Sequence, residues 1–308
     1  MPRVTVLPNG VTASCPRRGP NPETARRGRV RGWSPQATAR LRRWFYSVDG
    51  DRLDGRGFAV TLTVRDLPPT AAEWTRSRER FLERMRREGL LRGQWLTEWQ
   101  KRGVPHLHGC LFFPEGSGVT AELVRRHWLE SAEEWSPGHS AQHVTLLWGL
   151  PGWLQYQAKH SARGVKHYQR ANVPEAWREG TGRLWGVLGA WPTREELHDV
   201  DWLTYWRFRR SLRRWLLAEA RKDGDWRRVA FLRRLLTDPE EKRSRVRAVG
   251  EFCPESVSLR LLEDAASAGC AHVTASERRA ERPSPRAAER DGSGPRSRGE
   301  ASARASLG

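Results

Sequence analysis

Two strand-like segments separated by a short glycine-containing join constrain the fold of this chain more than any other feature. Residues 94–100 read QWLTEWQ, residues 106–113 read HLHGCLFF, and the residues between them are KRGVP. Apolar and polar residues alternate over 94–100, which is typical of a strand that covers a core with one face, and 106–113 is predicted as a second strand that ends in an apolar run. The short join and its glycine predict that the two strands pair as a β-hairpin.

Further segments predict an α+β fold in which a central antiparallel sheet is flanked by helices. The alternation in FAVTLTV (58–64) indicates a strand, and HVTLLWG (143–149) is a second candidate. The glycines of GRLWGVLGAWP (182–192) indicate a strand or a loop. Helical periodicity and capping signals predict helices over residues 34–46, 68–89, 120–134 and 152–162.

Composition divides the chain into four expected regions. Residues 1–32 are rich in Pro, Gly and Arg without a period and predict a flexible basic arm, followed by a compact domain over 33–190. Residues 191–250 predict a basic helical region that contains a strongly basic helix over 205–222. Residues 251–308 are expected to form a largely disordered tail, because apolar periodicity is lost from about residue 275.

One capping signal falls inside the basic helical region. Thr193 and Glu196 have the spacing of a capping box, in which each side chain binds the backbone N–H of the other end of the motif. This spacing predicts that a helix begins near residue 193.

The charge of the chain limits its partners. Fifty-five basic residues against 36 acidic residues give a formal net charge of +19 at pH 7. An excess of this size predicts an acidic partner, of which nucleic acid is the first candidate. Only five of the basic residues are lysines, so arginine enrichment from a GC-rich genome explains part of the excess.

Cysteine spacing and hydropathy predict a cytoplasmic protein. Cys15, Cys110, Cys253 and Cys270 have no framework spacing and no C-x-x-C pair, which indicates reduced thiols. No apolar run approaches the roughly 18–20 residues of a membrane span. The N-terminal residues also lack the apolar core of a signal peptide.

The histidines at the start of the second hairpin strand are candidate metal ligands. Residues two apart share a strand face, so His106 and His108 project side by side. If the hairpin pairs Gln100 with Val104, Glu98 lies opposite His106 on the same face. One carboxylate and two imidazoles suit a divalent ion with open coordination positions. A one-residue slip would move Glu98 to the other face, and an isolated H-x-H is more often a surface or hydrogen-bonded pair.

A second pair of chemically active residues lies in the predicted helix over 152–162. Tyr156 and Lys159 are three residues apart and share a helix face. A tyrosine hydroxyl, with a pKa of about 10, is a poor nucleophile unless its developing charge is stabilised. A lysine one turn away can favour the phenolate or neutralise a phosphate. The alternative is that Tyr156 belongs to the core and Lys159 is a solvated charge.

Taken in order, the motifs FAVTLT (58–63), PHLHG (105–109) and YQAK (156–159) resemble those of the HUH endonucleases. More narrowly, they are similar to the rolling-circle replication initiator (Rep) proteins of phages and small plasmids, as are KHSARGVKHYQR and GRLWGVLG. The resemblance covers roughly residues 33–190. Many relatives have a second tyrosine just after the lysine, where this chain has His160, so a single nucleophile is expected.

The resemblance implies a metal-dependent endonuclease that nicks single-stranded DNA. Mg²⁺ or Mn²⁺ held by Glu98, His106 and His108 would polarise the scissile phosphodiester. Tyr156 would attack, leaving a 5′-phosphotyrosine and a free 3′-OH primer, and Lys159 would stabilise charge on the phosphate. The implied partners are single-stranded or hairpin origin DNA, a host helicase and a host DNA polymerase.

Basic and aromatic residues outside the three motifs are candidate DNA contacts. The residues expected to bind phosphates are Lys166, Arg207, Arg209, Arg210, Arg213 and Arg214. Trp95, Trp99 and Trp153 are candidate stacking platforms for unpaired bases, although each has the pattern of a core residue.

Three other classes of protein remain open from the sequence. An HUH transposase or mobilisation relaxase is the nearest, but relaxases usually place the tyrosine before the histidines. A zinc hydrolase also uses H-x-H, but His108 is followed by Gly109 and Cys110 rather than by further ligands. A non-enzymatic basic nucleic-acid-binding protein would explain the charge but not the combined motifs. Only an HUH enzyme is expected to form a covalent adduct with single-stranded DNA.

Overall fold

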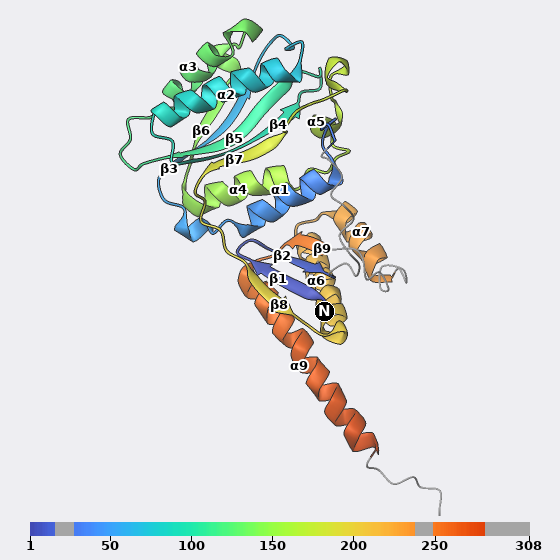
Figure 1. Cartoon of the computed structure of the whole chain (residues 1–308). Coiled ribbons are helices and arrows are strands. Elements are labelled where there is room, and N and C mark those ends of the chain that lie inside the picture. The colour runs from blue at the N-terminus through green and yellow to red at the C-terminus, as the bar shows by residue number, and fades with distance from the viewer. Residues whose placement is uncertain (16–27, 238–248, 281–308) are drawn as a thin grey trace, which may run out of the picture. The chain divides into compact units, whose positions relative to one another are not determined.

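The computed structural model describes residues 1–15, 28–237 and 249–280, and Figure 1 shows the arrangement of its helices and strands. The fold is α+β and contains two antiparallel sheets. One has five strands in the order β6-β3-β5-β4-β7, and the other has four in the order β8-β1-β2-β9. This confirms the prediction of an antiparallel sheet flanked by helices.

The five-stranded sheet carries the histidine motif on its middle strand. Its strands are β3 (Arg56–Thr63), β4 (Arg92–Trp99), β5 (Pro105–Phe113), β6 (His143–Leu147) and β7 (Trp185–Gly189). Every residue of β5 is buried, because the strand lies between β3 and β4 and both of its faces are covered.

The predicted hairpin and its register are confirmed. The Gln100 N–H donates to the Val104 carbonyl over 2.9 Å, and the ladder pairs Glu98 with His106. The turn contains Gly103 at φ +80°, a left-handed conformation that favours glycine.

Gly109, the last residue of PHLHG, is required by the close approach of β4 to β5. A Cβ atom at this position would lie 2.7 Å from the Gln94 carbonyl oxygen, so a larger residue would push the two strands apart. The glycine therefore protects the hydrogen-bonded pairing that aligns the motif residues.

Helices cover both faces of the five-stranded sheet (Figure 1). The helices α2 (Ala71–Arg87) and α3 (Ala121–Ser131) lie on one face, and α1 (Pro35–Ser47) and α4 (Gly149–Ser161) lie on the other. All four expected helices are thus confirmed. Shorter helical segments are Gly50–Arg52, Glu133–Trp135, His139–Ala141, α5 (Tyr168–Ala171) and Glu175–Trp177.

The alternation of β5 divides the hydrophobic side chains into two cores. Leu107, Leu111 and Phe113 pack in one core with residues of α2 and α3 such as Phe81 and Trp128. On the opposite face, Cys110 and Phe112 pack with residues of α1 and α4, among them Phe45, Trp153 and Tyr156. His106 and His108 share this second face, so the chemistry lies under α1 and α4.

The second sheet corrects the prediction of a flexible arm over residues 1–32. Residues 3–14 form two strands that pair with each other and with strands from near residues 196 and 252. The elements of this part are β1 (Arg3–Leu7), β2 (Gly10–Ser14), β8 (Glu196–Asp199), α6 (Trp202–Lys222), α7 (Trp226–Thr237), β9 (Val249–Phe252) and α9 (Glu255–Ala280). The averaged composition of 1–32 concealed two five-residue strands, whereas residues 16–27 lie outside the described part.

Two further expectations in the C-terminal region are wrong. Thr193 and Glu196 form no capping box, because Glu196 begins β8 and the following helix begins at Trp202. The N-cap is Asp201, whose side chain accepts the backbone N–H groups of residues 203 and 204. The predicted disordered tail over 251–308 is helical over 255–280, and residues 281–308 lie outside the described part.

The strongly basic helix over 205–222 is confirmed as part of α6. Its apolar side packs on β1 and β2 in a separate core that includes Val4, Val6, Phe208 and Leu212. The expected basic helical region over 191–250 therefore also contains β8 and the start of β9, which complete the second sheet. Within the described residues, no helix is both long enough and apolar enough to cross a membrane.

Candidate active site

A carboxylate and two imidazoles converge beneath α4. One ligand atom from each of Glu98, His108 and His160 lies within 4.8 Å of the others. Glu98 Oε2 is 3.5 Å from His108 Nε2 and 3.9 Å from His160 Nδ1. All three side chains are buried. Their convergence is therefore fixed by the packing of the fold and is not a chance approach of mobile surface groups.

His106 completes the cluster, and neighbouring residues orient the histidine pair. The Nε2 atoms of His106 and His108 are 2.9 Å apart, and Gln169 Nε2 is 3.4 Å from His106 Nε2. On the other side of its ring, His108 Nδ1 is 2.9 Å from Thr61 Oγ1. Thr61 belongs to the FAVTLT motif, and its contact turns the Nε2 atom of His108 toward Glu98.

His160 is the cluster member that the sequence analysis did not identify as a ligand. It lies one helical turn after Tyr156 on α4, and its ring centroid is 4.6 Å from that of His108. The sequence does carry a signal for it, because Tyr156 and His160 are four residues apart and share a helix face.

Burial keeps the histidines neutral. Loss of solvation, with smaller contributions from Arg163 and Lys159, lowers the pKa of His106 to about 4. Burial likewise holds the pKa of His108 and that of His160 well below their ordinary value. A neutral imidazole carries a lone pair on one of its two ring nitrogens, and this is the form that binds metal ions.

Two arginines hold the Glu98 carboxylate. Arg170 Nε lies 3.1 Å from Oε1, and Arg163 donates to Oε2 and also lies 3.1 Å from His160 Nδ1. Arg170 is fully buried and stacks over the Trp33 ring at 4.4 Å. Burial raises the pKa of Glu98 while the two guanidinium groups oppose this shift. A fully buried arginine with several partners is a rigid support for a carboxylate.

The cluster fits a divalent cation by its donor chemistry. Glu98 offers an anionic oxygen, and the three histidines offer neutral nitrogens from two sheet positions and one helix position. Imidazole nitrogens suit transition metals, whereas Mg²⁺ prefers an all-oxygen shell. This donor set therefore favours Mn²⁺ or another transition metal over Mg²⁺.

The structure does not bring the Tyr156 hydroxyl to the cluster. The hydroxyl donates to Gln94 Oε1 over 3.2 Å, and the ring packs with Phe45 and Trp153. The Tyr156 ring does lie beside the cluster, since its centroid is 4.6 Å from that of His160, but the hydroxyl is bonded to Gln94 rather than to a member of the cluster. Burial, followed by the neighbouring Cys110, raises the pKa of Tyr156 well above its ordinary value. In this conformation the hydroxyl is a protonated core group.

Lys159 and Lys166 lie on the exposed side of the same segment. Both side chains are exposed, and the charge of Lys159 contributes to the lowered pKa values of the histidines in the cluster. Lys159 is therefore close enough to act electrostatically on a group bound at the cluster.

The arginines of α6 divide into buried and exposed sets. Arg209 and Arg213 are buried: Arg209 stacks over the Tyr205 ring at 5.3 Å, and Arg213 donates to the Leu235 carbonyl over 3.2 Å. These two pack inside the second-sheet part, whereas Arg207 is half-buried and Arg210 and Arg214 are exposed. Exposed candidate phosphate contacts on this helix are thus fewer than its composition suggested.

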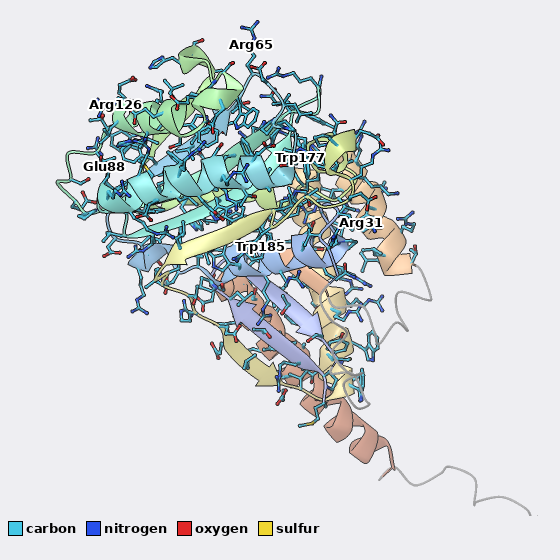
Figure 2. All side chains as sticks on the ribbon, turned by 45° about the horizontal axis from the view of Figure 1, so that its top comes forward. Arg31, Arg65, Glu88, Arg126, Trp177 and Trp185 are labelled. Carbon is cyan, nitrogen blue, oxygen red and sulfur yellow. The ribbon has the colours of Figure 1, made fainter. Side chains whose placement is uncertain are left out.

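The three tryptophans that were candidate stacking platforms are not at the surface. Trp95, Trp99 and Trp153 are buried, so they pack in the core in this conformation. Cationic side chains do project from the surface around the five-stranded sheet, and Figure 2 shows Arg65 and Arg126 directed away from the ribbon. The exposed charge is spread over several elements.

A buried sheet face that gathers a carboxylate, three neutral imidazoles and nearby cationic groups defines an α+β protein with a candidate site for a divalent cation. Comparison with known proteins is more specific. The family model for the replication-associated protein ORF2/G2P matches residues 57–173, which include every member of the cluster. The relatives below show that the chain belongs to this family.

The relatives match almost their whole length. The chain is 40% identical over 279 residues to a candidate replication protein of Xylella fastidiosa strain 9a5c, covering 87% of this chain and 98% of the relative. It is 42% identical over 255 residues to a candidate replication protein of strain Temecula1, covering 80% and 96%. It is 39% identical over 241 residues to the replication-associated protein G2P of Pseudomonas phage Pf3, covering 77% and 86%. No solved structure matches the chain significantly.

Proposed function

We propose that this protein initiates rolling-circle replication as an HUH-type endonuclease that nicks single-stranded origin DNA. The observation that carries the proposal is the convergence of Glu98, His106, His108 and His160 on one buried sheet face beside α4, the helix that carries Tyr156 and Lys159. Family membership supports a role in replication, and the cluster supports metal-assisted chemistry on a phosphate.

The proposed reaction is a transesterification. The tyrosine hydroxyl gives up its proton as its oxygen bonds to the scissile phosphorus, the bond from phosphorus to the 3′ oxygen breaks, and the 3′ oxygen takes up a proton, so that no net proton is gained or lost. The products are a 5′-phosphotyrosine and a 3′-OH that can prime a host polymerase. A divalent cation bound at the cluster would polarise the phosphate as a Lewis acid. Lys159 stabilises the added negative charge, and Thr61 and Arg170 keep His108 and Glu98 oriented.

Tyr156 is the proposed nucleophile, and its use requires that the side chain leaves Gln94. In the structure the hydroxyl is buried and bonded to Gln94, so a phosphodiester cannot reach it. Tyr168 is the alternative, because it is the exposed member of the four tyrosines. It also directly precedes Gln169, whose side chain contacts His106.

Covalent capture of DNA tests both the activity and the nucleophile. The full-length protein is incubated with labelled single-stranded oligonucleotides tiled over its replicon, in Mn²⁺ or Mg²⁺, and adducts are resolved on denaturing gels. We expect an adduct that is lost in Tyr156→Phe, lost in EDTA and retained in Tyr168→Phe. Loss in Tyr168→Phe alone would transfer the nucleophilic role to Tyr168. DNA binding without any adduct in the wild type would leave only a non-enzymatic DNA-binding role.

The proposed partners follow from the reaction and the charge. Origin DNA in single-stranded or hairpin form is the substrate, and exposed basic residues such as Arg210 and Arg214 contact its phosphates. No Walker A motif occurs in the sequence, so a host helicase would unwind the duplex and a host polymerase would extend the 3′-OH.

A further inference from the structure

Arg163 occupies the cluster in a way that Arg170 does not. Its Nη1 atom donates to Glu98 Oε2 and lies 3.1 Å from His160 Nδ1. These are two of the three atoms that converge, since Oε2 is also the oxygen nearest to His108 Nε2. The guanidinium therefore already binds the atoms that a metal ion would need.

The contact also defines the protonation of His160. A guanidinium can only donate hydrogen bonds, so His160 Nδ1 must be the acceptor and the ring proton must lie on Nε2. The lone pair on Nδ1 can be shared with Arg163 or with a metal ion, but not with both. Binding of a cation through this atom requires that Arg163 moves.

Arg170 differs from Arg163 in its anchoring. Arg170 binds the other carboxylate oxygen, Oε1, and also donates to the His160 carbonyl over 2.8 Å while stacking on Trp33. Its side chain is 0% exposed, whereas that of Arg163 is 12% exposed and follows the end of α4. Arg170 can thus remain on Glu98 when a cation binds, and Arg163 has a route toward solvent.

Charge favours the same exchange. The cluster contains one carboxylate against two guanidinium groups, and a divalent cation between Glu98 and His160 would lie next to the Arg163 charge. Two cations at that distance in a buried site repel strongly, so Arg163 and the metal ion exclude each other.

We propose that Arg163 is an internal competitor for the metal site. Its guanidinium holds Glu98 and His160 together before a divalent transition-metal ion binds and is displaced when the ion binds. Once displaced, the guanidinium is free to pair with a phosphate of the DNA that the site is proposed to cleave. This inference deepens the proposed function and depends on it only for the existence of the metal site.

Measurement of Mn²⁺ affinity without DNA tests the competition. Free Mn²⁺ is titrated by electron paramagnetic resonance with the full-length wild type, Arg163→Gln and Arg170→Gln. We expect Arg163→Gln to bind Mn²⁺ about tenfold more tightly, because no charge-assisted hydrogen bond has to be broken. Arg170→Gln is the matched control and should bind more weakly, since Glu98 loses its fixed support. Unchanged or weaker binding by a folded Arg163→Gln protein would overturn the proposal.

A second variant keeps the test decisive if Arg163→Gln does not fold. Arg163→Lys retains the charge but presents a more compact donor, so its Mn²⁺ affinity should lie between those of the wild type and the glutamine variant. An affinity no higher than wild type would also overturn the proposal. A wild type that binds no Mn²⁺ overturns both this inference and the metal site of the proposed function. Mn²⁺ binding without DNA nicking overturns only the nuclease.

Discussion

The two faces of the five-stranded sheet use the same strands for different purposes. On the face under α2 and α3, β5 contributes Leu107 and Leu111 to an apolar core. On the face under α1 and α4, the alternate residues His106 and His108 meet Glu98 and its arginines. Burial stabilises the first face directly, whereas on the second it penalises every charge that lacks a partner. The fold can hold the polar cluster because apolar cores supply stability on both faces, one under α2 and α3 and one beside the cluster under α1 and α4.

The largest expected effect comes from breaking the polar face at its carboxylate. Glu98→Ala should reduce Mn²⁺ affinity by more than about 100-fold. Loss of a residue that only hydrogen-bonds to a metal ligand costs about 10–100-fold in affinity, and Glu98 is itself a candidate ligand. It should also lower the free energy of unfolding by roughly 3–5 kcal/mol, because the buried Arg170 loses its carboxylate counter-charge. Titration of Mn²⁺ and urea unfolding check the two parts. A stable Glu98→Ala protein would show that the ion pairs with Glu98 contribute little to stability.

A substitution at Leu107, between the two histidines, distinguishes the contributions of the two faces to stability and to metal binding. Leu107 is buried on the apolar face, so Leu107→Ala should lower the free energy of unfolding by about 2–5 kcal/mol. The Mn²⁺ affinity and adduct formation of the folded protein should stay within a few-fold of wild type. Urea unfolding and Mn²⁺ titration below the transition measure these quantities. Loss of Mn²⁺ binding in folded Leu107→Ala would show that the faces are coupled.

Lowering the pH should reduce the free energy of unfolding through the buried histidines of the polar face. An unfolded histidine has a pKa near 6.5, whereas that of folded His106 is about 4. Between these values the unfolded chain binds more protons, so the free energy of unfolding should fall as the pH is lowered from about 6.5 to 4. Thermal unfolding at several pH values should show a shallower dependence for His106→Gln. The same substitution at the exposed His139 is the control, and an equal change there would contradict the assignment.

The smallest expected effect comes from the hydrogen bond between Gln94 and the Tyr156 hydroxyl, which lies beside the cluster. Gln94→Leu removes the acceptor of the Tyr156 hydroxyl, at a loss of about 1 kcal/mol in the free energy of unfolding. If Tyr156 is the nucleophile, freeing its hydroxyl should leave adduct formation unchanged or raise it a few-fold. Single-turnover adduct assays measure this rate. A large decrease in a folded variant would mean that Gln94 holds Tyr156 in a productive position rather than a resting one.

Local patterns in the sequence determined the hairpin and three of the four members of the cluster. Residues 98–108 are close in the chain, their alternation sets which side chains share a face, and the Gly103 turn sets the register. These short-range constraints were enough to place Glu98 opposite His106 and beside His108. The helices of the same part were also predictable, because each has a period and a cap of its own.

Only the tertiary structure decided the rest. His160, Arg163 and Arg170 reach Glu98 from 62 to 72 residues away in the chain, through the packing of α4 and α5 on β4. The strands over residues 3–7 and 10–14 pair with each other in a hairpin, but the sheet is completed by partners near residues 197 and 251, and a five-residue alternation is too short to be distinguished from a basic arm by itself. The direction of the Tyr156 hydroxyl follows from which side chains fill the core beside Gln94. Sequence periodicity specifies a face, but the neighbour across that face is set by contacts between distant segments.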